Sequence, residues 1–379
     1  MVTGPPTAAS PGRHGTGRGG PGALAALVVA LLGAVALLVP APSDRTPPAP
    51  VPVTAAQVWP AAQRGELPGS LPDGPAYSPV LFLDARASIG TAPSPDGTTL
   101  RLLLRNADAT LRELRRLPMD RTPQYGGVTL ADSQLAWAES VTDPKGRART
   151  EVWAADLRSG AAPRRLATDT GAVAFFNSQY DMTVVDGQLY WVAVGPGDEP
   201  VTEVRSVPLT GGKVTVRTER GAWALSRWPW LTSAGSGQSG PVQLRDLQNR
   251  RDVTIDAAPS ELVTCSPTWC RVLVLSGDGP ARIDLMRPDG GDRQRMAGNT
   301  VTAAVIDVAL HDRFEVLSQA GPVTAPASSQ QLFVYDVTRR QTVDIAAGVG
   351  MVLCRAGVLW WSTGEDDALV WHTIDLRTV

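Results

Sequence analysis

Glu365, Asp366 and Asp367 are three consecutive acidic residues and the first candidates for chemistry in this chain. A calcium site would need roughly six to eight oxygen ligands arranged by a longer loop. A pair of catalytic carboxylates for glycoside hydrolysis would need fixed, facing positions. The loop instead lies between two apolar runs, 357–362 and 368–376, so the sequence predicts a solvated hairpin turn.

Cys265 and Cys270, in the stretch CSPTWC, are the second candidate group. A metal site needs more ligands than this spacing supplies, and the chain has only 3 histidines, which excludes a multi-histidine centre. In an oxidising compartment, a disulfide across a short hairpin is the expected state of such a pair. We therefore predict a disulfide between Cys265 and Cys270, a buried free thiol at Cys354, and no cofactor or metal.

The tryptophans form a third group, since Trp137, Trp191 and Trp360 take the same place in three similar stretches. Exposed tryptophans would suit a carbohydrate platform. Equivalent positions that repeat along a chain are, however, what packing between repeated units produces. We therefore predict that these three side chains lie in the core.

The sequence contains no nucleophile elbow, P-loop or zinc-protease motif.

These residues belong to a repeated pair of apolar strands that recurs about every 40 to 50 residues. Such a period, with no helical periodicity between the strands, predicts an all-β fold, a β-propeller of four-stranded blades. Seven copies indicate seven blades, with six as an alternative because the first copy is irregular; two stacked sandwiches would suit the strands but not the period. The last copy lacks a fourth strand, and residues 80–84 (VLFLD) are expected to supply it and close the ring.

The stretch SPDGTTLRLLL, residues 94–104, resembles the Ser-Pro-Asp-Gly hairpin of TolB-type and related WD40-like propeller repeats. In that pattern the turn links the innermost strand to the next one. The stretches VVDGQLYWV from Val184 and RAGVLWWST from Arg355 resemble degenerate copies. The resemblance covers residues 78–379, and it implies a protein-binding module and not a catalyst.

The N-terminal region predicts a membrane anchor. Residues 1–22 are rich in Gly, Pro, Ser and Thr and contain Arg13 and Arg18 but no acid, which predicts a disordered tail. Residues 23–41 are uncharged and long enough for a transmembrane helix. Because positive residues stay inside, the N-terminus is expected in the cytoplasm and the remainder outside. A signal peptide cleaved near Pro42 is the alternative.

Beyond the anchor, residues 42–77 begin with a proline-rich run that predicts an extended extracytoplasmic stalk, and residues 78–379 are expected to form the propeller. The expected location is thus the cell membrane, as a single-pass protein. The abundance of Ala, Arg, Gly and Pro resembles that of actinobacterial proteins with high genomic GC content.

The loops between the second and third strands of each copy vary most and are the expected binding surface. The candidate partner-binding residues in them are Asp143, Lys145, Arg147, Arg149, Asp198, Glu199, Glu365, Asp366 and Asp367. A net charge of −2 without a basic cluster argues against nucleic acid.

The sequence favours a non-catalytic module that binds a protein or cell-envelope ligand. The alternative is a propeller hydrolase or lyase acting on envelope glycans. Convergence of Asp, Glu, Arg or Tyr side chains from three or more blades on the central channel would favour that enzyme.

Overall fold

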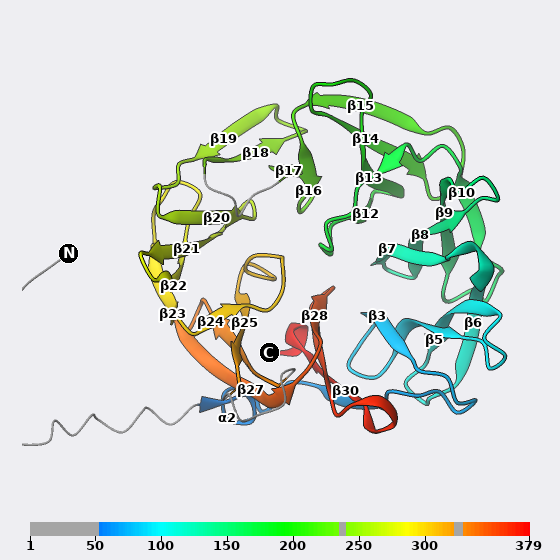
Figure 1. Cartoon of the computed structure of the whole chain (residues 1–379), viewed down its shortest axis with the longest axis horizontal. Coiled ribbons are helices and arrows are strands. Elements are labelled where there is room, and N and C mark those ends of the chain that lie inside the picture. Colours follow the sequence, from blue (N-terminus) through cyan, green and yellow to red (C-terminus); the bar gives the residue numbers. More distant parts are fainter. Residues whose placement is uncertain (1–52, 235–239, 322–328) are drawn as a thin grey trace, which may run out of the picture. The chain divides into compact units, whose positions relative to one another are not determined.

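The computed structural model describes residues 53–234, 240–321 and 329–379. Their strands form seven sheets arranged as a ring, an all-β seven-bladed propeller (Figure 1). The prediction of seven blades is confirmed, and the six-blade and two-sandwich alternatives are wrong. The predicted tail, the membrane helix and the first part of the stalk fall within residues 1–52, outside the described residues. In the described part of the chain, no helix is long and apolar enough to cross a membrane.

Each blade is an antiparallel sheet whose first-named strand is the innermost and whose last-named strand is the outermost. Blade 1 contains β3 (Ser78–Phe82), β4 (Ser88–Pro93), β5 (Thr99–Arg105) and β6 (Leu111–Pro118). Blade 2 contains β7 (Gln124–Ala131), β8 (Gln134–Thr142), β9 (Ala148–Asp156) and β10 (Arg164–Ala167). Blade 3 contains β11 (Ala172–Val173) with β12 (Met182–Val185), then β13 (Gln188–Val194), β14 (Val201–Pro208) and β15 (Thr215–Arg220). Blades 4 and 5 contain β16 (Trp223–Leu225), β17 (Trp230–Ser233), β18 (Val242–Asp246) and β19 (Arg251–Ile255); and β20 (Glu261–Cys265), β21 (Cys270–Ser276), β22 (Gly279–Met286) and β23 (Gln294–Gly298).

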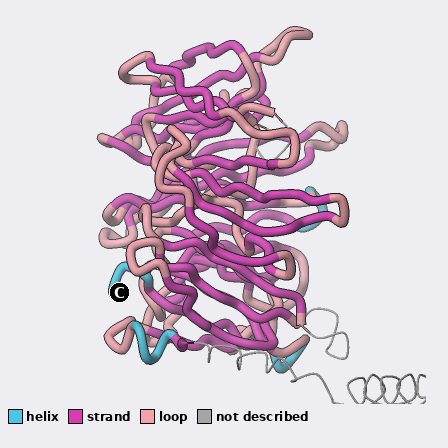
Figure 2. Tube along the Cα trace, turned by 90° about the vertical axis from the view of Figure 1, so that its left-hand side faces the viewer, coloured by secondary structure: helices cyan, strands magenta, loops and turns pink. Residues whose placement is uncertain are grey.

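Blades 6 and 7 also use strands from the N-terminal side. They contain β24 (Val301–Ala303), β25 (Phe314–Ala320), β26 (Gln330–Asp336) and β27 (Gln341–Val349); and β28 (Val352–Arg355), β29 (Val358–Thr363), β30 (Val370–Asp375) and β2 (Arg64–Pro68). In blade 6 the strand β1 (Val53–Thr54) adds to β27 in parallel as a fifth strand and is the outermost there. The short helices are α2 (Ala55–Val58), η1 (Met119–Arg121), η2 (Asp366–Ala368) and η3 (Leu376–Thr378). The strands run between two faces that carry the turns (Figure 2).

The ring closes where β2 pairs with β30, Gly65 lying opposite Thr373 and Leu67 opposite Trp371. Leu67 is buried in a cluster with Trp360 and Trp371. A Cβ at Gly65 would lie 2.0 Å from the carbonyl oxygen of Ala85, so the close approach of the strand requires glycine.

Closure of the ring by a strand from the N-terminal side was expected, but the strand that closes it is not the one predicted. The prediction that residues 80–84 complete the last blade is wrong, because Val80 to Phe82 belong to β3, the innermost strand of blade 1. Residues 53–77, assigned from the sequence to the stalk, instead supply β1, α2 and β2 to the propeller.

The turns also differ from expectation at one place. The Ser-Pro-Asp-Gly turn at Ser94 joins β4 to β5, the second and third strands of blade 1, and so lies on the same face as the variable loops. The turns after Val185 and Arg355 do join innermost strands to second strands, on the opposite face. The resemblance at Ser94 therefore identified a hairpin in the wrong place within its blade.

Tryptophans of the second strands fill the spaces between and within blades. Trp137 in β8, Trp191 in β13 and Trp360 in β29 are all 0% exposed, which confirms that they are core. Trp360 packs with Phe82 of the next blade at 5.2 Å between ring centroids. Repeated large side chains thus hold neighbouring sheets together.

Candidate functional site

An interruption of the innermost strand of blade 3 carries polar side chains into the central channel. The strand is split into β11 and β12, and both parts pair with β13. Residues 174–181 between them, which we call the bridging segment, leave the sheet; Asn177 has φ of 62°, a left-handed conformation that asparagine tolerates. In Figure 1 the green chain beside β12 reaches toward the middle of the ring.

The bridging segment contacts blades 6 and 7. The Ser178 hydroxyl donates to Oδ1 of Asp307 at 2.6 Å, and the Gln179 backbone N–H donates to Oδ2 at 3.0 Å. The Gln179 side-chain oxygen accepts the backbone N–H of Ala356 at 3.2 Å. Asp307 lies in residues 304–313, the long connection between the innermost strand β24 and the second strand β25 of blade 6. Three blades are therefore joined through hydrogen bonds at the channel.

Charged groups from these three blades converge there. Burial raises the pKa of Asp181 to about 6, and burial also raises the pKa of Asp307. Burial lowers the pKa of Arg355, while the charges of Asp181 and Asp307 act in the opposite direction. Arg355 forms no ion pair within 4.0 Å to any residue that the structure describes. Tyr180 lies beside them, and burial raises its pKa to about 12.

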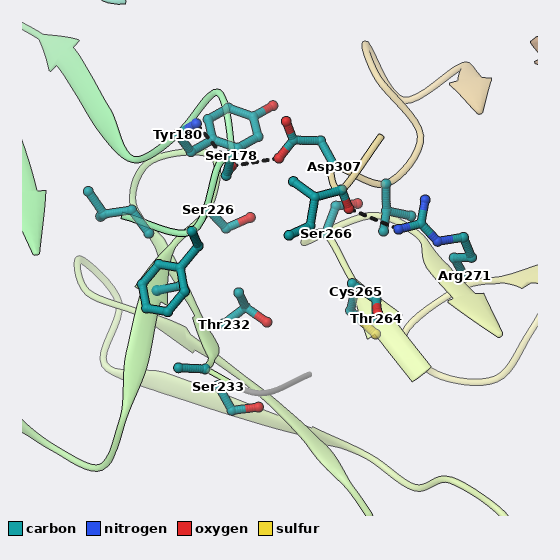
Figure 3. Close-up of a pocket in the computed structure, with 16 residues that line it drawn as sticks. Ser178, Tyr180, Ser226, Thr232, Ser233, Thr264, Cys265, Ser266, Arg271 and Asp307 are labelled. Atoms are coloured by element: carbon teal, nitrogen blue, oxygen red, sulfur yellow. Dashed lines mark hydrogen bonds between the residues drawn. The ribbon is translucent and has the colours of Figure 1, made fainter. Parts of the chain in front are cut away.

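A cavity of about 150 Å³ lies against the bridging segment, between blades 3 to 6 (Figure 3). Hydroxyl groups dominate its polar lining, and we call it the channel cavity. Its polar side chains are Ser178, Tyr180, Ser226, Thr232, Ser233, Thr264, Ser266, Arg271 and Asp307. Phe176 supplies an aromatic ring and Cys265 lies in the wall of blade 5.

Arg271 is the one cationic residue of this lining, and its charge is already compensated. Its guanidinium pairs with Glu315, which is 0% exposed, and donates to the carbonyl oxygen of Ile306 at 2.9 Å. The second carboxylate oxygen of Glu315 accepts the Ala309 backbone N–H at 2.7 Å. This network fixes residues 305–309, including Asp307, against blade 5.

The residues predicted from the sequence lie elsewhere, on the face of the loops between second and third strands. Asp143 accepts the backbone N–H groups of Lys145 at 2.8 Å and Arg147 at 3.0 Å and pairs with the Arg147 guanidinium at 3.1 Å. The Arg147 backbone bond in particular lowers the pKa of Asp143. Arg149 is exposed and lines a polar hollow of about 510 Å³ together with Asp169.

Asp198 and Glu199 border a second hollow on this face, of about 280 Å³. Its lining is mainly apolar and includes Val194, which is 60% exposed, and the buried ring of Trp223. Neither carboxylate forms an ion pair with a residue of the described ranges. The charge of this loop is thus available to a partner.

Glu365 and Asp366 lie at η2, between β29 and β30, and Asp366 has φ of 47°. Asp367 belongs to the same short helix by its backbone, and its side chain is outside the described structure. No group of three or more His, Cys, Asp or Glu in the described residues could hold a metal ion. The nine predicted residues therefore belong to blades 2, 3 and 7 and do not form one site.

The channel residues did not stand out in the sequence, although one signal pointed to them. Equivalent third strands end at Leu157 and Leu209, which are 52 residues apart, and at Pro288 and Val337, which are 49 apart. These are the two longest intervals, and they contain the bridging segment and residues 304–313 respectively. An insertion at the axis of a propeller places polar residues in the channel.

The cysteines are found in two states. Cys265 and Cys270 form a disulfide with an S–S distance of 2.04 Å across the innermost hairpin of blade 5. Cys354, in the innermost strand of blade 7, is a buried free cysteine, and burial raises the pKa of its thiol. A raised pKa keeps this thiol protonated and unreactive at neutral pH.

The raised pKa of Asp181 leads to a prediction about pH. Its native value of about 6 lies above the ordinary 3.8, so between these values the native state holds a proton that the unfolded state has lost. The contribution of Asp181 to stability should therefore rise as pH falls from about 6 to 4. Urea unfolding of the wild type and Asp181→Asn should show a difference that changes with this sign. A constant difference across the range would contradict it.

The comparisons with known proteins concern the fold. No protein-family model matches the sequence. No curated protein sequence matches it either. Among solved structures, a puromycin-hydrolysing peptidase of Mycobacterium tuberculosis is 14% identical with a TM-score of 0.50, over 82% of this chain and 55% of the peptidase.

Two further structures are similar at lower scores. The propeller domain of the Trilobed protease of Pyrococcus furiosus is 11% identical, with a TM-score of 0.42 over 64% of this chain and 78% of that chain. TolB of Acinetobacter baumannii is 12% identical, with a TM-score of 0.37 over 67% and 62%. The arrangement of its sheets shows that this chain is a seven-bladed β-propeller. Its distant structural similarity extends to peptidase propellers and to TolB.

Proposed function

We propose that this chain is an extracytoplasmic binding module, held at the cell membrane by residues 23–41, that recognises a protein or cell-envelope ligand without catalysis. We call the face that carries the loops between second and third strands the loop face. The observation that carries this proposal is that two hollows on the loop face lie beside the charged residues Arg149, Asp198 and Glu199. Charged loops on a rigid scaffold are a common form of recognition surface. In the channel, by contrast, Asp181 and Asp307 already accept hydrogen bonds from the bridging segment.

Charge reversal on this face tests the proposal. We expect Arg149→Glu, and separately the pair Asp198→Lys with Glu199→Lys, to weaken partner capture about tenfold while the melting temperature stays within a few degrees of wild type. Arg147 is the poorer choice because it stabilises its own loop through Asp143. The measurement is crosslinked capture from envelope extracts, quantified against wild type.

A matched control reverses charges on the opposite face. Arg158 and Lys213 are exposed in the turns between third and fourth strands of blades 2 and 3. Arg158→Glu with Lys213→Glu should leave capture unchanged. If this control loses the partner and the loop-face variants keep it, the wrong face has been chosen.

The proposed location has its own test. With residues 23–41 as an uncleaved anchor, protease added to intact spheroplasts should digest the propeller and leave the N-terminal tail protected. An epitope at each end of the chain would report the two results by immunoblot. Release of a mature protein beginning near Pro42 into the medium would exclude the anchor.

A second candidate function is the hydrolase or lyase acting on envelope glycans. It is favoured by the convergence of Asp181, Asp307 and Arg355 from three blades, since perturbed carboxylates beside an arginine are common in active sites. Incubation with isolated cell-wall glycans, followed by mass spectrometry of released fragments, tests it. Fragment release that Asp307→Asn and Arg355→Ala leave unchanged would argue against catalysis at the channel.

A further inference from the structure

We propose that the channel cavity binds a small, neutral, polyhydroxylated molecule of about the size of a monosaccharide. The proposal does not depend on the partner proposed for the loop face, although the cavity shares Phe176 and Ala234 with the hollow beside Asp198 and Glu199. Its walls come from blades 3 to 6, and the bridging segment forms one side (Figure 3).

The first argument is that the cavity contains hydroxyl groups without partners. Ser226 is only 5% exposed, and its hydroxyl makes no hydrogen bond with the described residues; Figure 3 shows it pointing into the cavity. The hydroxyl oxygen of Thr232 is buried with no partner in the described structure. Thr264 and Tyr180 also line the cavity with hydroxyls for which no hydrogen bond is found in the described ranges. Buried polar groups are normally satisfied, so these hydroxyls offer unused donors and acceptors to a polar molecule that enters the cavity.

The second argument concerns the chemistry of the lining. Hydroxyl groups both donate and accept, as do those of a sugar. Asp307 accepts bonds from Ser178 and Gln179, and a carboxylate has about four acceptor positions, so capacity for donors from a ligand remains. Phe176 offers an apolar ring against which C–H groups of a sugar can pack.

The third argument disfavours anionic ligands. Asp307 places a carboxylate in the wall, which disfavours anions, and Arg271 offers no compensating charge because Glu315 holds it. The volume of about 150 Å³ is below the roughly 300 Å³ of sites for drug-sized ligands. At about 30 Å³ for each water, it corresponds to about five waters, which limits the ligand to one small ring or a short polyol.

Calorimetric titration of the full-length chain tests the proposal with glucose, galactose, mannose and glycerol as probes, and with glucuronate as the anionic comparison. We expect millimolar binding of at least one neutral probe and weaker binding of glucuronate. A free monosaccharide and the end unit of a glycan chain offer the same hydroxyl chemistry. Maltotriose distinguishes these two sources, since it binds only if the end unit of a glycan can enter the cavity.

Two substitutions at one residue place the binding. Ser226→Ala removes an unpartnered hydroxyl, so folding should be unaffected and the dissociation constant should rise about fivefold. Ser226→Val fills the space and should abolish binding. Thr218→Ala, on the exposed outer strand of blade 3, is the matched control and should bind as wild type does.

The outcomes are decisive in both directions. Binding that Ser226→Val abolishes and Thr218→Ala preserves supports the proposal. No binding of any neutral probe, binding that survives in a folded Ser226→Val variant, or tighter binding of glucuronate than of every neutral probe would each overturn it. Circular dichroism of each variant confirms that the propeller is folded.

Discussion

Removal of residues 1–69 should convert the protein into an aggregating species, whereas removal of residues 1–50 should leave the propeller folded and soluble. The longer deletion removes β2 and exposes the edge of β30 along residues that now pair with Arg64 to Pro68. An unpaired, partly apolar strand edge is a template for association with other chains. Size-exclusion chromatography and thermal unfolding of the two truncations measure the difference.

The longer truncation removes α2 as well as β2, so a point substitution within β2 is needed to test ring closure alone. Leu67→Ala should lower the free energy of unfolding by about 2–5 kcal/mol, because the side chain is 1% exposed and packs with Trp360 and Trp371. Leu111→Ala, at a position that is 37% exposed, is the control and should cost much less. Equal behaviour of the two truncations, or of the two point variants, would contradict closure by β2.

The second large effect is expected at Glu315. Glu315→Ala should destabilise the propeller by about 3–5 kcal/mol, because it leaves the Arg271 guanidinium, whose side chain is 11% exposed, without its ionic partner. It also removes the acceptor for the Ala309 backbone N–H. Chemical denaturation measures the loss.

Asp252 provides a matched control, since it also pairs with an arginine, Arg245, but its side chain is 54% exposed. Asp252→Ala should cost no more than about 1 kcal/mol. Replacing both partners, as Arg271→Met with Glu315→Leu, should recover much of the stability because no charge is then left buried. If Glu315→Ala cost no more than Asp252→Ala, the buried pair would not support residues 304–313.

The sequence was most informative where local pattern and tertiary role coincide. Each blade buries its second and third strands, so their apolar residues repeat and the tryptophans recur at equivalent places such as Trp137 and Trp360. The incomplete last copy also indicated that a strand from the N-terminal side closes the ring. Period, composition and strand count were sufficient for the fold because propeller blades contact mainly their neighbours.

The apolar pattern of the sequence was misleading about which strand closes the ring, because the closing strand is not the more deeply buried one. VLFLD is strongly apolar because Leu81 and Phe82 lie in an innermost strand covered on both sides, not because it closes the ring. The strand that does close it, RGELP, contributes one buried leucine at an outer edge and so resembles a proline-rich linker. An outer strand needs few apolar residues, since one of its sides is solvent.

By itself, the sequence indicated an all-β propeller with seven blades favoured over six, its tryptophan core and the positions of the charged loops. The channel cavity was decided only by the tertiary structure. Ser178 and Asp307 are 129 residues apart and meet because the interruption of the innermost strand of blade 3 and the long connection between β24 and β25 of blade 6 both reach the axis. Ser226 has no local feature that marks it, and its unpartnered hydroxyl exists only because the ring brings the walls of four blades around it. Such a site has no sequence motif, since closure of the ring, and not spacing along the chain, brings its residues together.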